Sequence, residues 1–140
     1  MSKKKQKQSQ VIEIPKPILY TAKFLKAISS SLTTKFAAKL FTTPIRHKLP
    51  KRELHMERES VQKSIIIPEI NKEIVVYEYG KSDKKVLLVH GWSGRGTQLV
   101  KIADELLKMG YMTISFDAPA HGKSKGNYSI MTEFIASILE

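Results

Sequence analysis

The stretch Lys85-Val86-Leu87-Leu88-Val89-His90-Gly91-Trp92-Ser93-Gly94 decides the fold. Its apolar run from Val86 to Val89 is continuous, which is typical of a strand buried on both faces of a sheet. A glycine directly after such a strand lets the backbone turn without a Cβ clash, and it lets a ligand approach main-chain N–H groups. Such groups stabilise an oxyanion when they point into a dry cleft. The pattern also fits an ordinary turn between a strand and a helix, and the spacing alone leaves both interpretations open.

Strand and helix patterns alternate around this stretch. On its C-terminal side the sequence predicts a helix that ends at Gly110, a strand over 112–116 and a last helix capped by Ser129. The apolar positions of these helices are Leu99, Ile102, Ala103, Leu106 and Leu107 in the first and Ile130, Phe134, Ile135 and Ile138 in the last. On its N-terminal side, runs at 65–67 and 74–79 predict two strands joined by a hairpin-like turn. The order predicts an α/β fold in which an antiparallel pair leads into a parallel crossover.

A second loop that could carry chemistry follows the strand 112–116. It reads Asp117-Ala118-Pro119-Ala120-His121-Gly122-Lys123-Ser124. Like the turn after Val89, it lies at the carboxyl end of a predicted parallel strand, where the sites of open α/β sheets gather. Two such loops on successive strands indicate a site more strongly than either loop alone.

The stretch from 64 to 140 resembles the N-terminal part of an α/β-hydrolase-fold protein of the serine hydrolase, esterase or lipase type. His90-Gly91-Trp92 is similar to the family's His-Gly-x oxyanion loop. The loop from Asp117 to Ser124 is similar to the family's Asp-x-Pro-Gly-His-Gly-x-Ser loop, with Ala120 where glycine is more usual. The resemblance implies a partial α/β-hydrolase fold that contains strands 1–4, the first helix and the start of the second.

The resemblance further implies a strand order of 1-2-4-3-5 and onward. Without a fifth strand, residues 86–89 would form an unprotected sheet edge, and an exposed apolar edge invites pairing with other chains. We therefore expect the 140-residue chain to aggregate or to be poorly stable.

The same resemblance assigns roles to individual residues. The backbone N–H of Trp92 would be one donor of the oxyanion hole, and the family's other donor follows the nucleophile. Neither histidine of the two loops would be the catalytic one, which lies near the C-terminus in this family. A loop-shaping role falls to His90, Gly91, Asp117, His121 and Gly122.

The nucleophilic serine, the acid and the catalytic histidine are expected beyond residue 140. One sequence inside the chain, Gly122-Lys123-Ser124-Lys125-Gly126, does satisfy the Gly-x-Ser-x-Gly pattern. However, Pro119-Ala120-His121 precede it where an apolar strand should run into the first glycine. A phosphate-binding loop is also disfavoured, because Asp117 occupies the position of that motif's first glycine.

Composition excludes several classes of site. The chain has 140 residues with 41% hydrophobic and 26% charged residues, which is enough for one packed domain. The absence of cysteine excludes disulfides, thiolate zinc sites and cysteine nucleophiles. The four histidines show no ligand spacing, so neither a metal nor another cofactor is expected.

The net charge of +11 is unevenly distributed. Residues 1–60 carry 14 Lys or Arg against 4 Asp or Glu, whereas residues 61–140 carry 10 against 9. A nucleic-acid-binding domain would not divide its charge in this way, and no nucleic-acid motif accompanies the basic part. We predict a disordered basic tail over 1–15, a helical extension and linker over 16–60, and a truncated α/β-hydrolase domain over 61–140.

The helical pattern of the extension covers 18–41 in two pieces, with Ser29-Ser30-Ser31 weakening the middle. The charge-dense segment 46–59 is interpreted as a linker. Two interpretations of residues 1–41 stay open: the lysines hold the chain to an anionic membrane surface, or the helices pack on the domain and their lysines reach to water. No apolar run is long enough to span a membrane and no signal peptide is recognised, so the expected location is cytoplasmic, peripheral to the membrane under the first interpretation.

Two functions follow from these observations. The first is the N-terminal part of a serine-type α/β hydrolase that acts on an ester or similar acyl substrate, with the oxyanion loop but without the catalytic triad. The second is a non-catalytic, membrane- or partner-binding product of a truncated gene.

Overall fold

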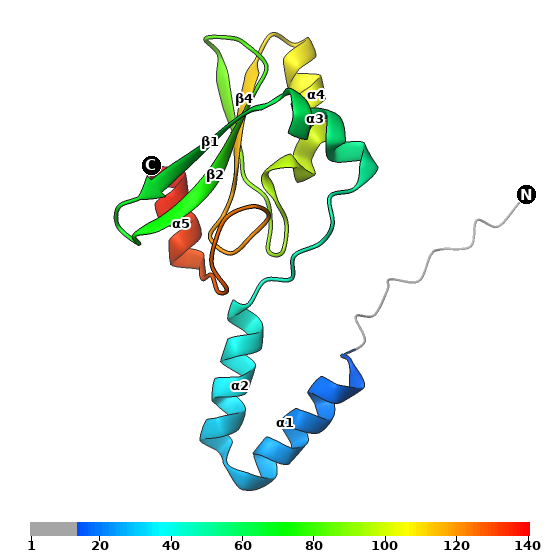
Figure 1. Cartoon of the computed structure of the whole chain (residues 1–140), viewed down its shortest axis with the longest axis vertical. Helices are drawn as coiled ribbons and strands as arrows, with labels where there is room; N and C mark the ends of the chain where they lie inside the picture. Colours follow the sequence, from blue (N-terminus) through cyan, green and yellow to red (C-terminus); the bar gives the residue numbers. More distant parts are fainter. Residues whose placement is uncertain (1–13) are drawn as a thin grey trace, which may run out of the picture. The chain divides into compact units, whose positions relative to one another are not determined.

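The computed structural model describes residues 14–140, so most of the predicted tail at 1–15 lies outside the described residues. The chain divides into two compact units, with the division between Ala38 and Lys39. Figure 1 shows the helices and strands. They are α1 (Lys16–Ile28), α2 (Ser30–Thr42), η1 (Lys51–Glu53), α3 (Leu54–Glu59), β1 (Val61–Ile67), β2 (Lys72–Tyr79), β3 (Lys85–Leu88), η2 (Gly96–Leu99), α4 (Val100–Lys108), β4 (Met112–Asp117) and α5 (Met131–Leu139).

The first unit contains α1 and most of α2, which confirms the predicted division of this helical stretch into two pieces. Ser29 separates them, because its backbone is extended and its amide still donates to the Leu25 carbonyl at the end of α1. The Ser29 hydroxyl accepts from the Leu32 N–H at 3.4 Å, so it also caps the start of α2. No residue of either helix is buried.

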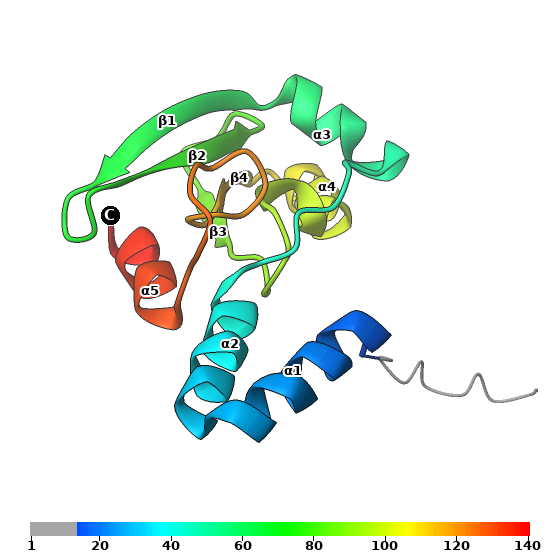
Figure 2. The same ribbon diagram turned by 60° about the horizontal axis from the view of Figure 1, so that its bottom comes forward.

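The second unit is built on a four-stranded mixed sheet with the order β1-β2-β4-β3. β1 and β2 form the predicted antiparallel hairpin, in which Ile67 pairs with Lys72 across the turn. β2 also pairs antiparallel with β4, whereas β3 and β4 run parallel with α4 between them in the chain (Figure 2). The α/β class and the predicted strand order are therefore confirmed.

Two apolar clusters lie on opposite faces of this sheet. Ile74 and Tyr79 of β2 belong to different clusters, as expected for residues an odd number of positions apart on a strand. One cluster packs α3 and α4 on the sheet and consists of Met56, Tyr79, Leu88, Val100 and Ala103. The other packs α5 on the sheet and consists of Ile67, Ile74, Phe116, Ala118 and Phe134.

The predicted burial of the third strand on both faces is wrong. Leu88 is buried, but Leu87 is 44% exposed and Val89 just after the strand is 37% exposed. The reason lies in the topology, because β3 stands at the edge of the sheet with only β4 beside it. A local apolar run cannot show which neighbours a strand will have.

The segment 46–59, interpreted above as a linker, instead contains η1 and α3. Met56 is fully buried in the α4 cluster. Glu53 is also fully buried, where its carboxylate accepts a hydrogen bond from Thr97 at 2.8 Å and lies 3.6 Å from Arg95. Because charged residues surround Met56 and Glu53 in the sequence, the hydropathy pattern does not predict that either side chain is buried.

The sequence predicts a helix stop at Gly110 and a helix cap at Ser129, and the structure supports only the first. Gly110 has φ +81, and the amides of Gly110 and Tyr111 donate to Leu107 and Leu106, so the predicted stop is a Schellman motif. The predicted cap at Ser129 is wrong, because Ile130 is the N-cap residue of α5 and makes no side-chain cap hydrogen bond. The Ser129 hydroxyl is buried without a partner among the described residues.

Candidate functional site

The two candidate loops lie together because the strands that precede them, β3 and β4, are parallel neighbours. Two hydrogen bonds join the loops. The Ala118 N–H donates to Nε2 of His90 at 3.1 Å, and the Gly96 N–H donates to Oδ1 of Asp117 at 2.6 Å. The two loops that the sequence places after successive parallel strands are therefore in direct contact in the structure.

Trp92 occupies the second position of a tight turn. The Gly94 N–H donates to the Gly91 carbonyl at 2.9 Å, and Ser93 at the third position has φ +56. A turn of this kind pairs its first carbonyl with its last N–H and leaves the central N–H groups unpaired. Among residues 14–140 no group accepts a hydrogen bond from the Trp92 N–H, so this donor is available to a ligand.

Gly91 differs from its first expected role. A Cβ added at Gly91 would meet no atom within 4 Å, so avoidance of a Cβ clash does not explain this glycine. The open space beside Gly91 agrees instead with its second expected role, the approach of a ligand to the main chain. The glycine that the turn requires sterically is Gly94, where a Cβ would lie 2.8 Å from the Gly91 carbonyl oxygen and 3.0 Å from Nδ1 of His90.

His90 braces both loops as a neutral imidazole. Nε2 accepts from the Ala118 N–H, so the ring proton resides on Nδ1, which donates to the Gly91 carbonyl at 2.7 Å. Burial lowers the pKa of His90 below its ordinary value, because the protonated ring would lose its solvation. This geometry gives His90 no free nitrogen with which to act as a general base.

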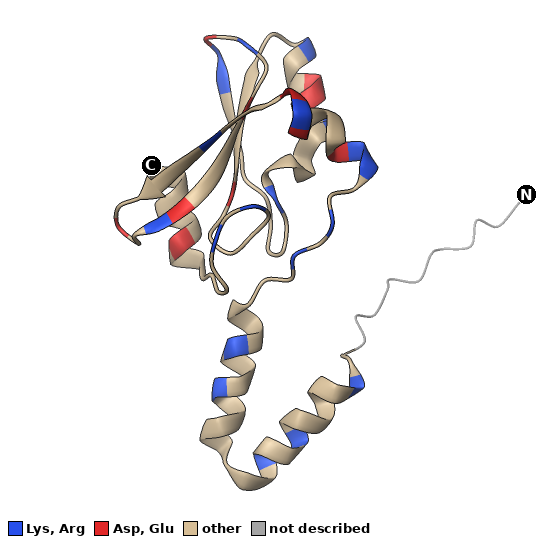
Figure 3. Cartoon of the chain, viewed as in Figure 1, with Lys and Arg blue, Asp and Glu red and all other residues tan. Residues whose placement is uncertain are grey.

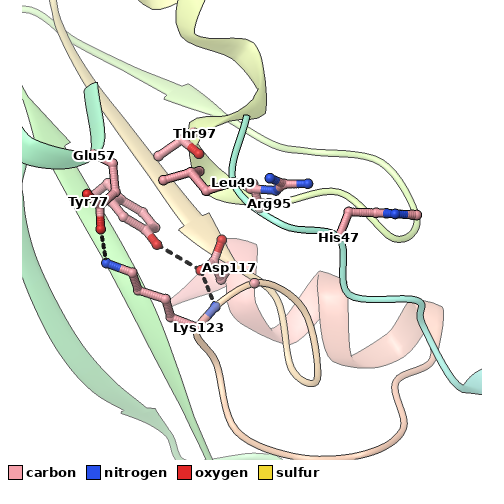
Figure 4. A pocket seen from close by; sticks show the side chains of 9 residues that line it. His47, Leu49, Glu57, Tyr77, Arg95, Thr97, Asp117 and Lys123 are labelled. Atoms are coloured by element: carbon pink, nitrogen blue, oxygen red, sulfur yellow. Dashed lines mark hydrogen bonds and ion pairs between the residues drawn. The ribbon is translucent and has the colours of Figure 1, made fainter. Parts of the chain in front are cut away.

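Asp117 organises the loop that follows β4. Its buried carboxylate accepts a hydrogen bond from the Gly96 N–H. It also accepts from the Lys123 N–H at 2.7 Å and from the Tyr77 hydroxyl at 2.8 Å (Figure 4). Burial first, and then the negative charge of Asp117, raise the pKa of the Tyr77 hydroxyl. Gly122 is required here, because its φ is +45 and a Cβ would lie 2.2 Å from the Asp117 carboxylate.

The cavity drawn in Figure 4 is lined by polar groups that largely satisfy one another. Its volume is about 200 Å³, and besides the groups around Asp117 it includes Glu57 and Arg95. Lys123 forms an ion pair with Glu57, and Arg95 donates to the Lys48 carbonyl at 3.0 Å. These partners favour a structural role for this cavity.

His121 is buried within an aromatic cluster beside Trp92. Its Nδ1 donates to the Pro119 carbonyl at 2.9 Å, whereas Nε2 is buried without a partner in the described chain. The ring centroid lies 5.1 Å from those of His90, Trp92 and Phe134. Burial lowers the pKa of His121, so the ring is held in its neutral form.

A larger, mainly apolar cavity opens beside the Trp92 turn. Its volume is about 560 Å³. Val89, His90, Gly91 and Trp92 line one side, and Ser129, Ile130, Met131, Phe134, Ile135 and Ile138 line another. The available N–H of Trp92 thus belongs to a residue that borders an apolar space.

Ser124 has a structural role. It is 1% exposed, its hydroxyl donates to the Asp117 carbonyl, and it accepts from the Val75 N–H at 2.9 Å. The Ser124 hydroxyl thus donates one hydrogen bond and accepts another, and none of its hydrogen-bond partners is a histidine. The rejection of Gly122–Gly126 as a nucleophile turn agrees with this geometry.

Sequence reasoning missed a segment that ties the two loops together. The Ile45 N–H donates to the Ser93 hydroxyl at 3.0 Å. The Arg46 guanidinium donates to the carbonyls of Ala120, Ser124 and Gly126. One arginine so far from these loops in the sequence gives no local signal, so only the folded chain shows this role.

Two further properties concern cofactors and membranes. Among residues 14–140 no group of three or more His, Asp or Glu side chains is arranged to hold a metal ion. None of the helices described has the length and hydropathy needed to cross a bilayer.

Comparisons with known proteins place this geometry in a known fold. No family model and no curated protein matches the chain. Two solved structures of an esterase from Pyrococcus furiosus match with 26% and 28% identity and TM-scores of 0.56 and 0.51, covering 70% and 69% of this chain. A bromoperoxidase from Bacillus anthracis matches with 25% identity and a TM-score of 0.49 over 56% of this chain.

The chain spans 38%, 37% and 29% of the lengths of these three structures, respectively. The esterase is an α/β-hydrolase-fold protein. The chain from β1 to α5 thus has the α/β-hydrolase fold, of which it contains the first four strands, the first helix and the start of the second.

Proposed function

We propose that this chain forms the oxyanion-loop part of a serine-type hydrolase that acts on an ester or a similar small acyl substrate. In this role the Trp92 N–H donates a hydrogen bond to the oxygen of the tetrahedral intermediate, and the acyl group occupies the apolar cavity beside it. His90, Gly91, Asp117, His121 and Gly122 hold the two loops in place. No cofactor takes part in the proposed reaction.

The observation that carries this proposal is the available N–H of Trp92 beside an apolar cavity of about 560 Å³. An oxyanion donor is effective when it is fixed before the reaction, because no reorganisation is then needed as charge develops. The turn from Gly91 to Gly94 supplies this rigidity, since Ile45 holds Ser93 and His90 holds Gly91. The likeness to an esterase structure supports an ester as the substrate class.

The proposal also requires a nucleophilic serine, and Ser124 does not fit this role. The two loops contain one serine in a Gly-x-Ser-x-Gly pattern, Ser124. Its hydroxyl already donates to the Asp117 carbonyl and accepts from the Val75 N–H. We therefore propose that the nucleophilic serine, its histidine base and its acid come from a further segment after residue 140. The alternative remains a non-catalytic, membrane- or partner-binding product of a truncated gene.

Reading the coding sequence past codon 140 separates these two functions. An in-frame Gly-x-Ser-x-Gly within about 30 codons supports the hydrolase, because in this fold the turn joins the next strand to the next helix. A stop codon at position 141 supports the alternative. The direct assay is hydrolysis of p-nitrophenyl esters by the 140-residue chain and by the longer protein, and only the longer protein is expected to turn over.

A further inference from the structure

We propose that the first unit binds the surface of an anionic phospholipid bilayer through an exposed apolar stripe on α1 and the lysines beside it. This inference concerns only residues 16–38, and it does not depend on the proposed hydrolase function. Two independent observations support it. Large apolar side chains are exposed on α1, and the charged side chains of the helices are all basic.

The apolar stripe consists of Tyr20, Phe24 and Ile28. These residues are four positions apart, so they lie on one face of α1. They are 64%, 66% and 60% exposed, respectively. Single exposed apolar residues need no explanation, but an aligned row on a helix with no buried residue offers a surface to an apolar partner.

The charge beside this stripe has a single sign. No Asp or Glu occurs between Glu13 and Glu53. Figure 3 accordingly shows only basic positions along α1 and α2. On α1, Lys16 and Lys23 lie four residues before and three residues after Tyr20 and therefore lie beside it. Lys26 lies on the other side of the helix, away from Phe24 and Ile28. Among the described residues none of these three lysines forms an ion pair with a carboxylate.

An anionic bilayer satisfies both features at once. Helices that lie in a membrane interface place apolar side chains in the acyl boundary and lysines among the headgroups, and anionic lipids strengthen their binding. A nucleic acid would use the lysines but would leave the row of Tyr20, Phe24 and Ile28 without a role.

The test is flotation of the full chain with vesicles in a sucrose gradient, since aggregated protein sinks and bound protein rises with the lipid. The probes are vesicles of phosphatidylcholine alone and vesicles that also contain phosphatidylglycerol. We expect flotation with the anionic vesicles only, and we expect added salt to weaken it.

Variants on exposed helical positions separate the two contributions. Replacing Lys16, Lys23 and Lys26 with Gln should lower the vesicle partition coefficient by about 100-fold, because each lysine near an anionic surface contributes about fivefold. The double variant F24Q/I28Q should lower it by at least about tenfold through lost apolar burial. Two control variants in the second unit, K81Q/K84Q/K101Q for the three lysines and the single change I102Q for the apolar residues, should bind as the parent chain does.

Three outcomes would overturn the proposal. One is equal flotation with neutral and anionic vesicles. Another is flotation that both sets of α1 variants leave unchanged while circular dichroism shows their helices intact. The third is tighter binding to a single-stranded RNA than to the anionic vesicles, with no loss in F24Q/I28Q, which would assign the lysines to a nucleic acid.

Discussion

At the scale of single residues, the two site loops depend on backbone conformations that L-amino acids rarely adopt. Ala120 has φ +64, Ser93 has φ +56 and Gly122 has φ +45. A residue other than glycine in this region costs roughly 1–2 kcal/mol of conformational free energy. The loops hold these conformations through the hydrogen bonds described above and through one from the Ala120 N–H to the Lys125 carbonyl at 3.0 Å.

Ala120→Gly should therefore stabilise the protein. The relief of the positive φ outweighs the extra entropy of glycine in the unfolded chain, so we expect a gain of about 0.5–1 kcal/mol in the free energy of unfolding. Urea denaturation followed by Trp92 fluorescence measures this change. A lower urea midpoint for the glycine variant would show that the Ala120 methyl group contributes more than the strain costs.

Gly122→Ala is the opposite substitution in the same loop. Its Cβ would lie 2.2 Å from the Asp117 carboxylate, so the hydrogen bonds to Gly96, Lys123 and Tyr77 must shift. We expect a loss of at least about 2 kcal/mol in the free energy of unfolding. Unchanged stability would mean that the loop can open without affecting Asp117.

Burial of His90 and His121 predicts a pH dependence of stability. Both pKa values are lowered in the folded state, so the unfolded chain binds protons more readily. Stability is therefore fully present above about pH 6.5 and decreases as the pH falls below that value. Urea midpoints between about pH 7.5 and about pH 5.5 measure it, because histidine is the side chain whose ordinary pKa lies in this range.

His121→Leu is the control for this pH dependence. It places an apolar side chain among the rings of Trp92, His90 and Phe134 and removes one of the two histidines whose pKa is lowered. We expect a weaker fall of the urea midpoint toward low pH in this variant. A pH dependence identical to that of the parent chain would exclude His121 as a cause.

At the scale of elements, β3 is one of the two edge strands of the sheet, and β1 is the other. Strand β3 pairs with β4 on one side, and its apolar residues Leu87 and Val89 are partly exposed. Unpaired N–H and carbonyl groups beside apolar side chains make such an edge a template for pairing with other chains. The expected aggregation of the 140-residue chain follows from this strand and from the apolar cavity next to it.

Leu87→Lys should reduce self-association, because a lysine on an edge strand opposes pairing with another strand. Light scattering at about micromolar concentration should show a smaller average mass than for the parent chain. Ile102→Lys on α4 is a matched control, since Ile102 is 51% exposed but lies on a helix. Equal masses for both lysine variants would assign the association to a surface other than β3.

The segment between α2 and η1, which contains Arg46, stabilises the loop after β4. Arg46 holds three carbonyls of the loop that contains Ala120. Arg46→Met leaves these carbonyls without their charged donor and should cost on the order of 2 kcal/mol of stability. Amide hydrogen exchange should rise in residues 120–126 in this variant, and unchanged exchange there would contradict the role of Arg46.

Sequence patterns predicted those elements whose signals are local. The turn glycine at Gly110, the hairpin between β1 and β2 and the two loops after parallel strands all depend on a few adjacent residues. The wrong predictions concern features set by distant neighbours. Whether β3 is buried depends on which strand lies beside it, and the packing of Met56 depends on α4 rather than on the charged residues around it.

At the scale of the whole molecule, the second unit is the first part of an α/β-hydrolase fold, with a polar cavity around Asp117 and an apolar cavity beside Trp92. The first unit adds a basic helical segment with an exposed apolar stripe. We propose that the second unit contributes to ester hydrolysis and that the first unit contacts the membrane. These two proposals can fail independently.

The most direct test of the account compares Trp92→Pro with Trp92→Ala in the protein that also contains the nucleophilic serine. Both variants lose the indole, but only proline removes the N–H, and proline fits the second position of a turn. For p-nitrophenyl ester hydrolysis we predict that kcat of the proline variant is lower than that of the alanine variant by about 100-fold to 1,000-fold. Equal kcat values in two equally stable variants would contradict the account, because the Trp92 N–H would then have no part in the reaction.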